Sequence, residues 1–278
     1  MTLILTELTR FGIAMAADSA VKVVNPHTGL AQVVPGAAHK LQEVPYLNAG
    51  ISCWGEGEIE NVSTDQWLCG FIASNEGISN LQDFANELAR QLNDRIPSPP
   101  RGKGCLGFHL AGFEDFNGMP TPSFYHIHDG FCQTLASRGI EIDTTRFNAN
   151  HDVPPDIFLQ NPGYLIRNGD IRFYAEIFAS LERVFAHLRP IGVLIPHSQD
   201  LEDRARYLIF QVKTIAEIYR LSNVLPGIGG EIHYLTIPTT LLMLHEGPQA
   251  SISFYVTSGL DGFGSVSSLP VRLAFPAF

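Results

Sequence analysis

Three residues near the start of the chain have the types that catalysis by an N-terminal threonine requires. If Met1 is removed, Thr2 becomes the first residue, and its hydroxyl and its own α-amine supply a nucleophile and a base together. An α-amine has a reference pKa of about 7.7–8.0, so it is partly neutral near working pH. Asp18 and Lys40 are the candidate carboxylate and cation that would orient this amine. The chemistry indicated is attack on an amide carbonyl.

The elements around these residues are predicted to be short apolar strands. Four strands are expected over residues 2–8, 13–17, 40–44 and 49–54. Asp18 ends the second strand and Lys40 opens the third. Both side chains are therefore expected to point toward the start of the first strand.

The rest of the chain predicts runs of helices and strands rather than strict alternation. Helices are expected near 58–74, from Leu81 to Leu92 after a Ser79–Gln82 capping box, and over 171–188 and 200–223. A hairpin is expected around Asn117-Gly118, further strands over 231–237, 241–245 and 251–256, and mostly a long loop over 139–162. This order favours an α+β fold.

Composition excludes several classes of function. The net charge is −10, which argues against nucleic acid or an anionic membrane as the main partner. No apolar run approaches the ~20 residues of a membrane span, and the start lacks the pattern of a signal peptide, so a cytoplasmic protein is expected. The 4 cysteines form no CxxC pair and are expected to be free thiols.

Four segments, taken in order, resemble proteasome β-subunits and the bacterial HslV-type peptidases. By this resemblance the chain looks like a divergent bacterial member of that family. These segments are residues 2–4, 12–19, 40–46 and 49–55. The family consists of N-terminal-nucleophile (Ntn) hydrolases with a four-layer αββα fold, in which two stacked, mostly antiparallel sheets lie between helix pairs. The resemblance implies one domain over residues 1–278, with an enlarged 135–165 loop and an extended C-terminal tail.

The resemblance also implies a role for each matching residue. The nucleophile falls on Thr2, the buried aspartate on Asp18 and the catalytic lysine on Lys40. The oxyanion glycine falls near Cys53 to Gly55; Gly55 is favoured, with the Cys53 and Trp54 amides left open.

The polar support that the family places before Gly229-Gly230 is missing, because Leu225 and Ile228 stand there. Asn168 and Asp170 are the candidate substitutes.

The function expected is a threonine-type amide hydrolase, a peptidase that needs no metal or organic cofactor. Its substrates would be peptides or unfolded proteins inside a homo-oligomeric ring or spiral; ring size and any ATPase partner are not given by the sequence. Charged residues make up 17%, below the roughly 25% of average domains, which favours subunit contacts. Trp54, Trp67 and Phe71 are expected to contribute to those contacts.

Three alternatives remain beside this expectation. In the first alternative, the chain is a non-catalytic ring or scaffold subunit. In the second, it is a small-molecule amidase on the same fold. His126 and His128, two residues apart on one strand, are a weaker candidate pair of metal ligands.

Overall fold

The described part of the chain forms a mixed α/β fold built on antiparallel sheets, as the sequence predicts. The structure is a computed structural model. It describes residues 2–24, 27–96, 106–129, 146–160, 163–169, 172–188, 200–222, 227–239 and 253–257. Within these segments there are two five-stranded sheets and two small two-stranded ribbons.

The first sheet contains the N-terminal hairpin at its centre. Its order is β12 (Tyr164–Gly169), β1 (Leu3–Thr9), β2 (Gly12–Asp18), β13 (Ile232–Pro238) and β14 (Ser253–Thr257). All neighbouring strands are antiparallel, and Ile4 lies opposite Ala17. Every residue of β1 and β2 is buried, so both faces of this hairpin are covered.

The second sheet contains the segment that begins after Lys40. Its order is β11 (Asn148–Val153), β10 (Met119–His128), β9 (Leu106–Phe116), β6 (Ala49–Gly55) and β5 (Leu41–Val44). The predicted hairpin is confirmed: β9 and β10 meet at Asn117 and Gly118, whose φ values are 55° and 80°. Two successive positive φ values are typical of the turn that matches strand twist.

The short elements lie at the margins of the sheets. They are β3 (Val21–Val24) paired with β4 (Ala31–Val34), β7 (Glu58–Ile59) paired with β8 (Val62–Ser63), and the 3₁₀ turn Pro45–Leu47. The helices are α1 (Thr64–Ser74), α2 (Leu81–Arg95), α4 (Pro155–Gln160), α5 (Arg172–Leu188) and α6 (Leu201–Leu221). None of the described helices has the length and apolar character needed to cross a bilayer.

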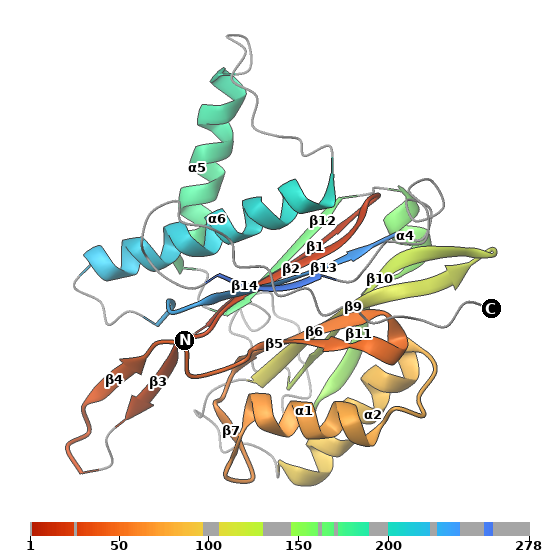
Figure 1. Cartoon of the computed structure of the whole chain (residues 1–278), viewed down its shortest axis with the longest axis horizontal. Helices are drawn as coiled ribbons and strands as arrows, with labels where there is room; N and C mark the ends of the chain where they lie inside the picture. Colours follow the sequence, from red (N-terminus) through yellow and green to blue (C-terminus); the bar gives the residue numbers. More distant parts are fainter. Residues whose placement is uncertain are drawn as a thin grey trace.

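Three buried clusters hold these elements together. Side chains from both sheets, such as Ile4, Met15 and Leu41, form the cluster between them. A second cluster joins the first sheet to α5 and α6, and a third joins the second sheet to α1 and α2. Figure 1 shows the same arrangement: the sheets are stacked, with α6 beyond one and α1 and α2 beyond the other.

Several local expectations need correction. Residues 148–153 and 155–160 form β11 and α4 instead of a loop. The first helix starts at Thr64, six residues later than expected, because β7 and β8 occupy 58–63. Asn80, not Ser79, caps α2, with its side chain accepting from Asp83 N. The predicted strand at 241–245 and the tail beyond 260 lie outside the described residues.

Candidate active site

Asp18 is the last residue of β2 and is fully buried. Its Oδ1 accepts from Leu3 N at 2.9 Å, and its Oδ2 accepts from Ala20 N and Gly229 N, both at 3.2 Å. These N–H groups come from three separate segments of the chain. The carboxylate therefore has a fixed orientation before any side chain approaches it.

Lys40 reaches this carboxylate from the other sheet. It immediately precedes β5, is 6% exposed, and donates to both Asp18 oxygens at 3.2 and 3.1 Å. A third bond runs from Nζ to Ala20 O at 2.5 Å. A buried ion pair is tolerated only when its hydrogen bonds are satisfied, and here every ammonium proton has an acceptor. Lys40 and Asp18 thus meet across the sheet–sheet boundary.

Thr2 directly precedes the residue whose amide Asp18 binds. It is 5% exposed, and its carbonyl lies against β12. A Cβ on Gly169 would lie 1.8 Å from Thr2 O, and Gly169 has a φ of +101°. Only glycine lets β12 run this close to Thr2. The backbone at Thr2 is held on one side by Gly169 and on the other, through Leu3 N, by Asp18.

The loop at Gly229-Gly230 closes over the end of β2. Gly229 O accepts from Ser19 N at 3.2 Å and from Ala20 N at 3.0 Å. A Cβ on Gly230 would lie 2.6 Å from Ser19 Oγ, so this position also requires glycine. Ile228 is buried in the cluster with α6 and presents no polar group to Thr2, while Leu225 lies outside the described residues.

The three candidate oxyanion amides differ in what they bind. Cys53 N donates to Lys40 O at 2.8 Å, so the candidacy of this amide is corrected: it is already occupied. Successive N–H groups of a strand point to opposite edges, so Trp54 N faces β9 and Gly55 N faces the β5 edge. Gly55 is exposed and has a φ of +103°. Cys53 N and Gly55 N therefore face the same edge, and Gly55 is the candidate amide there that does not bind Lys40 O.

Cys53 is not a reactive thiol. Burial is the main cause that raises its pKa to about 12, which keeps the group protonated at neutral pH. Cys69 is exposed and free, and the other two cysteines lie outside the described residues.

Of the two residues proposed as polar support, Asn168 and Asp170, the structure describes only Asn168. Asn168 lies on β12, and its side-chain oxygen binds His109 Nε2 at 2.8 Å, so the amide is committed to that histidine. Asp170 lies outside the described residues. Sequence reasoning missed His109, because a single histidine in an apolar strand carries no motif.

The histidine pair on β10 lies near other rings. The ring centroids of His126 and His128 are 4.4 Å apart, and His126 is 5.4 Å from His109. No set of three or more His, Cys, Asp or Glu side chains in the described segments is placed to hold a metal ion.

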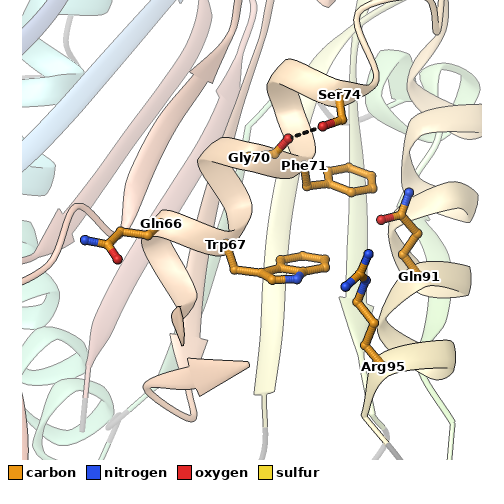
Figure 2. A pocket seen from close by; sticks show the side chains of 7 residues that line it. All are labelled: Gln66, Trp67, Gly70, Phe71, Ser74, Gln91 and Arg95. Atoms are coloured by element: carbon orange, nitrogen blue, oxygen red, sulfur yellow. Dashed lines mark hydrogen bonds between the residues drawn. The ribbon is translucent and has the colours of Figure 1, made fainter. Parts of the chain in front are cut away.

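A cavity of about 400 Å³ lies elsewhere, between α1 and α2. Figure 2 shows Trp67 and Phe71 on one side of it and Gln91 and Arg95 on the other. None of its lining residues is Thr2, Asp18 or Lys40. Phe71 is buried and the Trp67 ring stacks on it at 5.7 Å, while Trp54 lies in the cluster between the sheets. Trp54 and Phe71 therefore pack inside the chain, whereas Trp67 is partly buried and lines the cavity.

Comparisons with known proteins give no family. No protein family model matches the chain, and no curated protein sequence matches it. Among solved structures it resembles the Gly-1 mutant of Anbu from Hyphomicrobium sp. strain MC1, with a TM-score of 0.48, 14% identity, and coverage of 95% of this chain and 90% of that chain. It also resembles Anbu, named an ancestral beta-subunit, from Yersinia bercovieri, with a TM-score of 0.45, 14% identity, and coverage of 86% and 82%.

These comparisons correct the expected membership in the proteasome β-subunit and HslV-type family. The expectation is wrong because no family model or curated sequence supports it, and the similar structures are Anbu proteins at 14% identity. At TM-scores of 0.48 and 0.45 the similarity carries no inference about activity. The chemistry of this chain has to be judged from its own residues.

Proposed function

We propose that the chain is an N-terminal threonine amide hydrolase whose nucleophile is Thr2 after removal of Met1. The observation that carries the proposal is the buried Asp18–Lys40 pair, which also holds the amide of Leu3 beside Thr2 at 2.9 Å. A buried ion pair at a strand end, next to a hydroxyl residue, is costly for stability and is typical of a functional site. The helix–sheet–sheet–helix order supports an assignment to the four-layer αββα arrangement of Ntn hydrolases.

The proposed reaction is hydrolysis of an amide bond, with water as the second substrate. Thr2 Oγ attacks the amide carbonyl carbon while its proton passes to the Thr2 α-amine. The amine then protonates the leaving nitrogen as the C–N bond breaks, which leaves an ester on Thr2. Water hydrolyses that ester and restores the hydroxyl. Lys40 is the cation that favours a neutral amine, and Gly55 N is the proposed donor to the oxyanion.

The test combines intact mass with covalent labelling. The purified chain should lack Met1, and an electrophile that acylates N-terminal threonine should add one equivalent to Thr2. Thr2→Val, which removes the hydroxyl without changing the size of the side chain, should abolish labelling, whereas Thr2→Ser should retain it. Complete retention of Met1 in labelled, active protein would refute the mechanism.

The second test replaces the Lys40 ammonium with a cation of different geometry. Lys40→Arg should fail to label, because a planar guanidinium does not reproduce the three bonds that the Lys40 ammonium makes. If processed wild-type protein with a free Thr2 is not labelled, the non-catalytic scaffold is the remaining function, and Ile228 in place of a polar residue is the observation that favours it.

We further propose that the protein is homo-oligomeric and takes short or unfolded peptide substrates. The support is a set of exposed apolar side chains on α5 and α6, namely Val184, Phe210 and Leu221 at 51%, 45% and 75%. A contiguous exposed apolar surface marks a contact site, and we propose that these residues contribute to such surfaces between copies of the chain. Light scattering coupled to size exclusion tests it: Phe210→Glu should reduce the mass, and a wild-type monomer near 30.6 kDa that retains activity would favour a small-molecule amidase.

A further inference from the structure

His109 forms a polar bridge between the two sheets. It lies on β9 of the second sheet and is fully buried. Its Nδ1 is 2.9 Å from Thr6 Oγ1 on β1, and its Nε2 is 2.8 Å from Asn168 Oδ1 on β12. Phe124 lies edge-on to the ring with centroids 5.0 Å apart. One side chain therefore binds two neighbouring strands of the opposite sheet.

The bridge is complete in its neutral form. Asn168 Oδ1 only accepts, so His109 Nε2 carries the proton and Nδ1 accepts from the Thr6 hydroxyl. Burial, followed by the neighbouring His126, holds the pKa of His109 well below its usual range. The imidazole is thus neutral at physiological pH, with both nitrogens satisfied.

Residues that lie directly opposite one another on neighbouring strands form a row across a sheet. In the second sheet, the row that contains His109 starts at Leu41, next to Lys40. Leu41 lies opposite Ser52, and Ser52 lies opposite His109. Leu41 is the residue directly after Lys40. A shift of this row moves Lys40 with it.

In the first sheet, Asn168 lies in the row that ends beside Asp18. Asn168 lies opposite Ile4, and Ile4 lies opposite Ala17, which directly precedes Asp18. The His109–Asn168 hydrogen bond therefore joins the row next to Lys40 to the row next to Asp18.

The other contacts between the sheets are mainly apolar and fix position less strictly. Ile4, Leu41 and their neighbours fill space, but dispersion contacts change little when the two surfaces slide slightly. Hydrogen bonds weaken steeply with distance and angle. The Lys40–Asp18 bonds of 3.1 and 3.2 Å would not survive a displacement of about 1 Å.

We propose that His109 is a positioning residue that sets the register of the two sheets, and through it the placement of Lys40 against Asp18 and Thr2. This inference rests on the proposed threonine chemistry. His109 touches no substrate; it acts through the strands that carry the reacting groups.

The experiment measures the rate and the affinity of Thr2 labelling separately, together with the melting temperature. His109→Leu removes both hydrogen bonds, and His109→Gln keeps one acceptor and one donor. The triple variant Thr6→Val/His109→Leu/Asn168→Leu removes the bridge without leaving a buried polar group unpaired, so it is expected to fold stably. His151→Leu is the matched control, because His151 is a hydrogen-bonded histidine at the outer edge of the same sheet.

The expected result is a labelling rate constant about 10- to 100-fold lower in His109→Leu and in the triple variant, with the binding constant of the electrophile unchanged. His109→Gln recovers most of the rate, and His151→Leu does not change it. Normal labelling by the stably folded triple variant would overturn the inference and leave His109 a purely structural residue. Wild-type protein that is not labelled at Thr2 would instead overturn the proposed function, and this inference with it.

Discussion

The two ends of the layer between the sheets are built differently. At the polar end, two separate hydrogen-bonded contacts join the sheets: Lys40 binds Asp18, and His109 binds Thr6 and Asn168. At the apolar end, around β6 and β13, Leu235 and Met15 fill the space beside Gly50, so that a Cβ there would lie 2.5 and 2.6 Å from their side chains. One end is held by directional polar contacts and the other by close packing.

The difference separates two kinds of specificity. Close packing contributes most of the stability, because burial of apolar surface yields about 25 cal/mol per Å². Buried polar groups add little net stability even when all are paired, but they are costly when one partner is lost. A site that needs reacting groups at fixed distances gains from the second kind, and the far end of the layer does not need it.

The largest expected effect is at the polar end. Asp18→Ala leaves the Lys40 ammonium buried without its partner, and the free energy of unfolding should fall by about 3–5 kcal/mol. Denaturant unfolding measures the change. Asp18→Ala/Lys40→Met removes the charge as well and should recover the part of the loss due to the unpaired ammonium, while Leu3 N and Gly229 N still lack their acceptor. If Asp18→Ala lowered the free energy of unfolding by less than about 1 kcal/mol, as expected for an exposed ion pair, the Asp18–Lys40 pair would not be shielded from water.

The apolar end should respond to an added methyl group. Gly50→Ala places its Cβ against Leu235 and Met15, and overpacking of this kind costs about 1–3 kcal/mol. Gly57→Ala is the control, because nothing lies within 4 Å of that position. Equal unfolding free energies for the two variants would show that this end is loosely packed.

The sequence predicts the two hairpins well because their signals are local. The turn at residues 10–12 and the pair Asn117-Gly118 both lie between apolar strands, and β1, β2, β9 and β10 form where expected. Asp18 and Lys40 are proposed as carboxylate and cation from the needs of threonine chemistry, their positions at strand ends and the resemblance of their segments to a known family, and the structure places their side chains in contact. Their catalytic role stays a proposal.

Other features depend on contacts that the sequence does not mark. His109 and Asn168 are 59 residues apart, so neither predicts the other. β11 was missed because it is an edge strand with mostly exposed residues, which removes the alternation of apolar and polar positions. The Cys53 amide was left open because only the register of β5 and β6 shows that it binds Lys40 O.

Acid should destabilise the protein through its buried histidines, and at the polar end through His109. Burial lowers the pKa of His109 well below its usual range, and it lowers those of His128 and His233 to about 4. The unfolded chain therefore binds more protons below about pH 6.5, and stability, fully present above that pH, falls as pH drops toward 4. Each histidine contributes a slope of up to about 1.4 kcal/mol per pH unit.

Urea unfolding at a series of pH values measures this slope, with His128→Asn as the matched variant. Removing one such histidine should reduce the slope by about 1.4 kcal/mol per pH unit, while residue-level hydrogen exchange should show β9 and β10 opening first near His109. A slope that does not change in His128→Asn would mean that this imidazole is already protonated in the folded state.

The smallest expected effect comes from deleting single hydroxyl groups at the polar end. It tells whether a polar group stabilises the protein only when it has a hydrogen-bond partner. Ser52 lies in the row between Leu41 and His109, and its Oγ is buried with no hydrogen-bond partner among the described residues. Removing an unpaired hydroxyl relieves its desolvation cost, so Ser52→Ala should stabilise the protein by up to about 1 kcal/mol. Thr6→Val, which breaks a bond to His109 of 2.9 Å, should destabilise it by about the same amount. Opposite signs from two hydroxyl deletions on the inner faces of the two sheets would show that paired contacts, rather than polar residues as such, hold this end together. A loss of stability in Ser52→Ala would instead reveal a bound water or partner at that hydroxyl, and the polar bridge would then extend from His109 toward β5.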